Sequence, residues 1–322
     1  AHADSIALAQ LSPDGLRLAT WSRDGTGALL DVPTGSVVSR VPLGSKVQPS
    51  NIAFTRDGRR VAYVKADGGL LVMDPKNGQT VLDVAGSAGA RLVAELGASE
   101  LVSLAGSTLS VLDPDGRPIR TISNLQFTSP MVLEGSADGR WILVGDFSSG
   151  ARLLDAETLQ EVWNHSAPAT HVRSGAFSAD GRWMAVGNSR GTTLLVALAD
   201  MSVRQLEGHA SRTWFAEFSP DSKLLATTSY DGTARIWSVE TGEVQAILSH
   251  PNWVPTARWS ADGSRIATSC ADGNVRVFEI ERGRMLLRLS GHEGHVFDAE
   301  FAPDESTLVS VSGDGSVRFW RT

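Results

Sequence analysis

Short runs of alternating apolar and polar residues fill the chain, and turn signals bound each run. One run covers residues 224–228, the turn Asp231-Gly232 follows, and a second run covers residues 234–237. The turn Glu240-Thr241-Gly242 then leads to a third run at residues 244–248. Period-two alternation between such turns predicts β-strands joined by hairpins. Apolar spacing typical of long helices is absent from the sequence, so we expect an all-β chain of short antiparallel strands.

One local marker recurs along the whole chain: an apolar residue, two small or polar residues, and then Asp-Gly or a related pair. Its copies lie at residues 11–15, 54–58, 96–100, 136–139, 177–181, 218–222, 259–263 and 301–305. Successive copies are about 41 residues apart, and a repeat of that length with four short strands is typical of a β-propeller blade. We predict a single eight-bladed β-propeller over residues 1–322, with repeats at approximately 1–43, 44–84, 85–125, 126–166, 167–207, 208–248, 249–290 and 291–322.

The last blade is expected to differ from the others in its number of strands. Thr322 follows directly on the third run of repeat eight, Ser316 to Trp320, so this blade is expected to lack its outer strand. We expect that strand to lie before Ala1 or to come from another segment. Because the sequence begins at Ala1 without a Met, we also expect an effector domain before residue 1.

A fixed set of polar residues recurs in four repeats. Repeat six carries His209, Thr227, Asp231 and Trp237, and repeat eight carries His292, Ser310, Asp314 and Trp320 at identical spacing. Repeat seven keeps His250, Thr268 and Asp272, and repeat one keeps His2, Thr20 and Asp24. At the Asp position, repeats two, four and five carry Asp67 (without the His), Ser149 and Arg190.

With Gly208-His209 and Gly291-His292, these residues make the whole chain resemble the WD-repeat β-propeller family. Trp237-Ser238 and Trp320-Arg321 stand where that family has its Trp-Asp dipeptide. The resemblance implies that His, hydroxyl, Asp and Trp form a hydrogen-bonded tetrad across three strands of one blade. It also implies that a partner binds the face where the loop before strand one meets the turn between strands two and three.

The same residue types also form the catalytic triad of hydrolases. A catalytic site is normally singular, whereas this set occurs in four copies. A buried polar network whose hydrogen bonds are all satisfied pins strand register. We therefore interpret the tetrads as structural and expect no catalytic residue.

Three positions in each blade point to the predicted binding face: three and five residues after the tetrad His, and the residue before the turn Asp. Arginine and aromatic residues gather at these positions in blades five to eight, whereas blades two to four carry small or polar residues such as Ser148. Arginine and large aromatic residues dominate binding hot spots, and arginine recognises carboxylate or phosphate. We predict a partner-binding patch of Arg212, Trp214, Tyr230, Trp253, His295 and Phe297, with Arg173 and Arg23 at its margins. The alternative is that these rings only pack between neighbouring blades.

Composition narrows the classes of partner. The net charge of −7 argues against a nucleic-acid surface, where a basic stripe is expected. No apolar run approaches the roughly 20 residues of a membrane span, and no Cys/His metal spacing or phosphate-binding motif occurs. We expect no cofactor, no metal, no nucleic acid and no membrane partner. The single cysteine, Cys270, fits a reducing cytoplasmic compartment, and the Ala, Gly and Arg usage suggests a bacterial source.

These features predict a non-catalytic scaffold that binds a protein or peptide, as the sensing or docking domain of a larger signalling or regulatory protein. Two alternatives stay open. One is a propeller enzyme with its site at the central channel, and the other is a structural domain that oligomerises.

Overall fold

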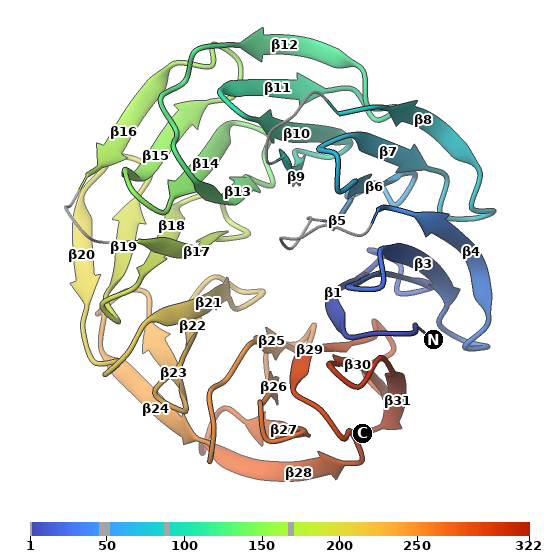
Figure 1. The fold of residues 1–322 in the computed structure, drawn as a ribbon. Coiled ribbons are helices and arrows are strands. Elements are labelled where there is room, and N and C mark those ends of the chain that lie inside the picture. Colours follow the sequence, from blue (N-terminus) through green and yellow to red (C-terminus); the bar gives the residue numbers. More distant parts are fainter. Residues whose placement is uncertain (1, 45–51, 87–90, 167–170) are drawn as a thin grey trace. The chain divides into compact units, whose positions relative to one another are not determined.

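Strands of three to seven residues build the whole fold. The structure is a computed structural model that describes residues 2–44, 52–86, 91–166 and 171–322. These residues form 31 strands and no helix, so no described segment is a helix that could cross a membrane. Seven sheets have four strands and the eighth, β29-β30-β31, has three (Figure 1). This arrangement confirms the predicted all-β architecture of eight blades, including the last blade that lacks its outer strand.

Each sheet takes its strands consecutively from the chain. The first four sheets contain β1 (Ile6–Leu11), β2 (Arg17–Ser22), β3 (Thr26–Asp31) and β4 (Val37–Pro42); β5 (Ile52–Phe54), β6 (Val61–Val64), β7 (Leu70–Met73) and β8 (Thr80–Val84); β9 (Arg91–Leu96), β10 (Glu100–Ala105), β11 (Thr108–Leu112) and β12 (Pro118–Ile122); β13 (Pro130–Gly135), β14 (Trp141–Asp146), β15 (Gly150–Asp155) and β16 (Glu161–His165). The last four contain β17 (Val172–Phe177), β18 (Trp183–Asn188), β19 (Thr193–Ala197) and β20 (Val203–Leu206); β21 (Thr213–Phe218), β22 (Leu224–Ser229), β23 (Thr233–Ser238) and β24 (Val244–Ser249); β25 (Ala257–Trp259), β26 (Arg265–Ser269), β27 (Asn274–Glu279) and β28 (Arg284–Ser290); β29 (Val296–Phe301), β30 (Thr307–Ser312) and β31 (Val317–Arg321).

The chain divides into two compact units, and in each of them neighbouring blades share apolar clusters. The first unit holds residues 1–144 and 152–164, and the second holds residues 145–151 and 165–322. In the first unit, Trp21 of blade one is buried in one cluster with Phe54 and Tyr63 of blade two. In the second unit, Trp237 of blade six shares a cluster with Leu195 of blade five. Blades therefore stack through alternating apolar positions of their inner strands, as the sequence pattern predicts.

The recurrent marker is the turn between strands one and two. In blade six, the Ser219 hydroxyl donates to Asp221 at 2.7 Å, and Asp221 accepts from the Lys223 amide at 3.1 Å. The same hydroxyl-to-carboxylate bond closes the marker turns of blades one, two, four, five and seven. The residue after the Asp has positive φ, which favours glycine, yet Ser222 and Glu305 adopt it in blades six and eight. The marker is thus a turn that fixes the hairpin of the first two strands.

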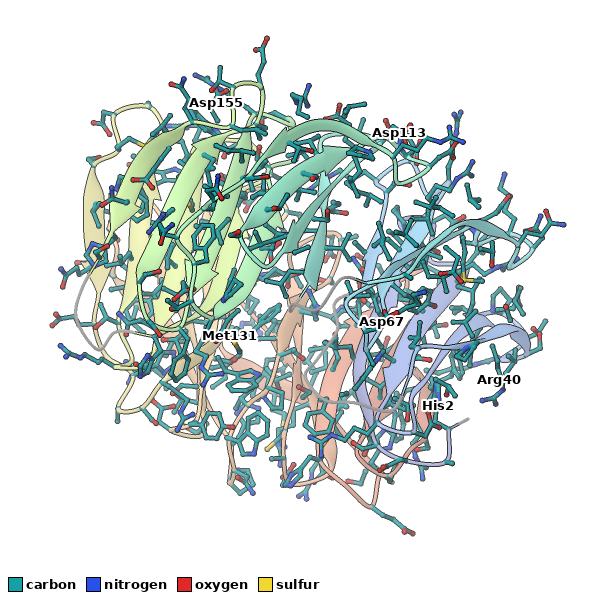
Figure 2. All side chains as sticks on the ribbon, turned by 45° about the horizontal axis from the view of Figure 1, so that its top comes forward. His2, Arg40, Asp67, Asp113, Met131 and Asp155 are labelled. Carbon is teal, nitrogen blue, oxygen red and sulfur yellow. The ribbon has the colours of Figure 1, made fainter. Side chains whose placement is uncertain are left out.

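Antiparallel order decides which loops share an end of a blade. Strands one and three run the same way, so the loop before strand one lies beside the turn between strands two and three. In Figure 2, Met131 at the start of β13 lies at one end of blade four, and Asp155 at the end of β15 lies at the other. Asp113, which follows β11, lies at the same end as Asp155. The predicted binding positions of a blade therefore all lie at the end where strand one begins.

Candidate functional site

The structure joins the four predicted tetrad residues by hydrogen bonds in blades six and eight. His209 Nδ1 lies 3.0 Å from Asp231 Oδ2, and its Nε2 lies 2.9 Å from Thr227 Oγ1. The indole of Trp237 donates to the same hydroxyl at 2.8 Å. In blade eight, His292 lies 2.9 Å from Asp314 and 2.8 Å from Ser310, which accepts from Trp320 at 2.8 Å. Each chain of bonds links the loop before strand one to strands two and three.

The tetrad hydroxyls are held in hydrogen bonds and buried, so they cannot act as nucleophiles. Asp231 accepts from Nδ1–H of His209, so Nε2 accepts the proton of Thr227, whose oxygen in turn accepts the indole N–H. Thr227 is fully buried, and Ser310 of blade eight is 1% exposed. A nucleophile must reach its substrate, so this arrangement supports the structural interpretation of the tetrads.

Blade one holds a looser form of the network. His2 Nε2 lies 2.8 Å from Thr20, but Nδ1 bonds Thr26 at 2.9 Å and stays 3.5 Å from Asp24. The Thr26 hydroxyl donates to Asp24 at 2.6 Å and so bridges the two. Hydrogen bonds from Thr26 and from the Ala3 amide outweigh burial and lower the pKa of Asp24 to about 2.

Blade seven departs from the predicted tetrad. His250 Nε2 lies 2.8 Å from Thr268, but its Nδ1 bonds the Leu248 carbonyl at 3.0 Å. Asp272 instead accepts from Arg276, at 2.6 Å between Nη2 and Oδ2. The identical His–Asp spacing therefore does not produce a His–Asp bond in this blade.

A glycine before the histidine explains the difference. In blade six, a Cβ built on Gly208 would lie 2.5 Å from Nη1 of Arg235, and in blade eight a Cβ built on Gly291 would lie 2.8 Å from Nη1 of Arg318. Blade seven has Ser249 at this position. We infer that its side chain takes the place that the arginine occupies in the other two blades, so that Arg276 turns to Asp272.

In blades four and five, the turn between strands two and three is stabilised by a residue other than the tetrad Asp. Asp146, at the end of β14, accepts from the amides of Ser148 and Ser149 at 2.7 and 2.9 Å. Asn188, at the end of β18, accepts from the Arg190 amide at 2.8 Å. In blade two, Asp67 accepts from the amides of Gly69 and Gly86. Sequence reasoning missed Asp146 and Asn188 because each lies two positions before the place that the tetrad Asp takes in blade six, at the last residue of strand two.

Burial keeps the tetrad histidines neutral. It is the largest cause lowering the pKa of His2, His209 and His292, against the opposing pull of their aspartates. The pKa of His250 falls to about 4, because burial is reinforced by the nearby positive charge of Arg276. Neutral imidazole can donate from one ring nitrogen and accept at the other, which the tetrad requires.

The predicted binding residues of the second unit form one continuous set of ring contacts. Tyr230 stacks on Trp253 with centroids 4.7 Å apart and planes 8° apart, and Trp214 packs edge-on against both at 5.3 and 5.5 Å. The centroid of the Trp253 ring also lies 6.2 Å from that of His295 and 6.4 Å from that of Phe297. These residues, with Arg173, Arg212, Phe147 and His171, are called the aromatic patch below.

Two arginines border the rings of the aromatic patch. The Arg212 guanidinium carbon lies 4.7 Å from the centroid of the Tyr230 ring. That of Arg173 lies 5.8 Å from the Trp214 centroid and 5.1 Å from Phe147. Burial, followed by repulsion from Arg212, lowers the pKa of Arg173. These cation–π contacts fix both guanidinium groups beside the same cluster of rings.

Phe147 and His171 extend the aromatic patch to blade four. Their rings stack with centroids 3.7 Å apart, and His171 Nδ1 bonds the Phe147 carbonyl. His295 bonds the Ala271 carbonyl in the same way, at 2.7 Å, so Phe147 holds the position before the turn in its blade. The prediction that Ser148 lies before the turn and Ser149 at the Asp position is therefore wrong by one residue, because blade four lacks the turn Asp by which the other blades are aligned.

Part of the aromatic patch is open to solvent. The rings do pack across blades, but Tyr230 keeps 38% of its surface exposed, and Arg212 and His295 are exposed. Trp214 and Trp253 are half-buried. Arg23 belongs to the first unit, where it is exposed beside Ser5 in blade one, so the aromatic patch is described without it.

A second charged group lies on the first strands of blades six to eight. Arg258 on β25 reaches Glu217 on β21 at 3.4 Å and Asp298 on β29 at 3.1 Å. Burial raises the pKa of Glu217. The positive charge of Arg258 compensates the negative charges of both carboxylates. Within the described residues, no group of three His, Cys, Asp or Glu side chains is placed to hold a metal ion. Sequence reasoning missed this bridge because its members lie in three separate repeats.

Comparisons with known proteins agree with this architecture. The family described as WD domain, G-beta repeat matches residues 200–238, 242–279 and 283–321. The chain is similar in structure to the computationally designed Ika8 protein, whose crystal structure gives a TM-score of 0.82 at 21% sequence identity. The alignment covers 100% of this chain and 97% of that chain. No curated protein matches the chain.

The chain is an eight-bladed β-propeller. Residues 200–321 match the model of the WD repeat three times, and each match includes the first three strands of blade six, seven or eight.

Proposed function

We propose that the protein is a non-catalytic scaffold whose protein or peptide partner binds the aromatic patch. The observation that carries this proposal is the unbroken series of ring contacts from Phe147 to Phe297, built on the loops and turns at one end of blades four to eight. The propeller fold with WD repeats is consistent with such a scaffold.

The physical basis is preorganisation. The rings are fixed by their neighbours and by the strands below them, so binding costs little side-chain entropy. Half-buried Trp and Tyr side chains offer a large apolar area together with a polar group, and such residues contribute most of the energy in many interfaces. The tetrads of blades six and eight hold the loops that carry Arg212 and His295.

A pull-down from the native host tests the proposal. The double variant Trp214→Ala plus Trp253→Ala, checked for folding by circular dichroism, should lose most partner recovery relative to the wild type. Trp183→Ala, subject to the same check of folding, is the control, because it removes a half-buried indole of the same unit at the marker-turn end of β18, opposite the end of the strand that leads to the aromatic patch. Undiminished recovery by the double variant would rule out the aromatic patch as the binding site.

Two other functions give different results. A structural domain that assembles through the aromatic patch would elute as an oligomer in size-exclusion chromatography, and the double variant would elute as a monomer; we expect a monomer for both. An enzyme would need free acid or base groups, and the bridge of Arg258 to Glu217 and Asp298 gives no support for that. A role in a larger cytoplasmic signalling protein of bacterial origin, with an effector domain, stays a prediction.

A further inference from the structure

We propose that the aromatic patch recognises an acidic segment of its partner, with a carboxylate or phosphate group bound between Arg173 and Arg212. Apolar side chains next to that anion would lie on Trp253 and Phe297. This inference rests on the proposed function and adds the chemical class of the ligand.

The positions of the two guanidinium groups point to one shared anion. Arg173 lies over Trp214 and Arg212 lies over Tyr230, and these two rings are in edge contact at 5.3 Å. The positive charge of Arg212 also acts directly on Arg173. An anion beside the Trp214–Tyr230 edge could therefore accept hydrogen bonds from both arginines, and charge-assisted bonds of this kind are the strong ones.

Within the described residues, neither arginine has a carboxylate within ion-pair distance. By contrast, Arg258, Arg265 and Arg276 of the same unit are each paired with Asp or Glu. Nε of Arg173 is buried and has no hydrogen-bond acceptor in the part of the chain that the structure describes. A buried donor without a partner is costly, and two like charges without a counter-ion repel each other. A bound anion would relieve both costs.

Charge favours an acidic peptide over a nucleic acid. The chain carries a net charge of −7, so its long-range field opposes a polyanion. Two arginines among five aromatic side chains suit one or two anionic groups flanked by apolar residues. A strand of phosphates would instead need a basic groove along its whole length.

An array of random decapeptides that includes phosphoserine tests the inference. The wild-type protein should select peptides with Asp, Glu or phosphoserine next to Trp, Phe or Leu. Preference for the carboxylates or for phosphoserine identifies the source of the anion. A fluorescein-labelled oligothymidylate should bind more weakly than the selected peptides. Selection of no peptide, selection without acidic residues, or tighter binding of the oligonucleotide would overturn the inference.

Matched variants then locate the anion. Fluorescence anisotropy with a selected peptide should show at least a tenfold loss of affinity for Arg173→Gln and for Arg212→Gln. Arg182→Gln makes the same charge change in the marker turn of blade five, at the opposite end of its strands, and should stay within about twofold of the wild type.

The same variants separate the two proposals. If the peptide depends on Trp214 and Trp253 but not on the arginines, the acidic ligand is wrong and the proposed function stands. If the partner pull-down is also unaffected by the double tryptophan variant, the proposed function fails as well.

Discussion

At the scale of single residues, Asp231 is the acceptor on which the tetrad of blade six depends. Its carboxylate accepts from His209, from the Ala210 amide and from the amide and hydroxyl of Thr233. Asp231→Ala removes these acceptors, so we expect a loss of about 1–3 kcal/mol in the free energy of unfolding, measured by urea denaturation. Asp200→Ala, in an exposed turn, should change it by less than about 0.5 kcal/mol. Equal stability of the two variants would contradict a structural tetrad.

His250 makes stability depend on pH in a defined window. Its pKa is about 4 in the folded chain and 6.5 ordinarily, so the unfolded chain binds the extra proton between these values. Stability should therefore fall as the pH drops from about 6.5 to about 4, by at most roughly 3 kcal/mol from this residue. Urea denaturation of His250→Gln should show a flatter profile across this window than that of the wild type. Gln205→Ala, which removes an exposed side chain without a titratable group from β20, is the control and should keep the wild-type slope; a wild-type slope in both variants would refute the assignment.

Blade seven shows where single-residue prediction stops. The family resemblance implied a hydrogen bond between His250 and Thr268, and the structure contains it. The resemblance also implied a bond between His250 and Asp272, but Asp272 accepts from Arg276, and we attribute this difference to Ser249, which stands before His250 where blades six and eight have a glycine. The spacing between His, Thr and Asp carries no information about the residue before the His, although that residue determines where a nearby arginine side chain can lie.

At the scale of elements, an outer strand should protect the strand beneath it. Ile236 on β23, which pairs with β24, is fully buried in a cluster that includes residues of blade seven. Phe319 holds the same position on β31, which pairs with no described outer strand, and it is 38% exposed. Ile236→Ala should cost about 2–5 kcal/mol, and Phe319→Ala only roughly 1–2 kcal/mol although it removes the larger side chain. Chemical denaturation compares the two. A larger loss for Phe319 would mean that β31 is covered in solution.

The bridge of Arg258 ties three first strands together. Arg258→Met would leave Glu217 and Asp298 without their counter-charge, and breaking a largely buried ion pair costs about 3–5 kcal/mol. Arg284→Met breaks the exposed pair with Glu279 and should cost under about 1 kcal/mol. Thermal unfolding at neutral pH should show this difference, and equal melting temperatures would mean that the bridge is not stabilising.

Hairpins were predictable from the sequence, and contacts between hairpins were not. The marker fixes a turn by bonds between residues two apart, as in Ser219 and Asp221, so its signal is local and survives in most copies. The contact of Phe147 with His171 joins two blades, and its position was miscounted because no turn Asp marks it. The members of the aromatic patch in blades six to eight could be predicted because the repeat spacing is regular there. Phe147 could not, because blade four departs from that spacing.

At the scale of the whole molecule, the eighth sheet is the exception to an otherwise uniform plan. Seven sheets end in an outer strand, and the eighth ends at β31, with one edge of backbone N–H and C=O groups unpaired by any described strand. Free sheet edges favour pairing with other strands. A strand supplied in the register that β24 takes on β23 should therefore bind this edge and cover Phe319.

A graft tests this directly. We append to Thr322 a copy of residues 240–249, which in blade six form the turn after β23 and then β24. The copied strand can pair with β31 as β24 pairs with β23, because Trp320 and Trp237 hold the same position. We expect the melting temperature to rise by about 2–4 °C and hydrogen exchange in β31 to slow. A copy with proline at the positions taken from Gln245 and Ile247 cannot complete the ladder and should do neither. Equal behaviour of the two extensions would mean that the edge of β31 does not accept a strand.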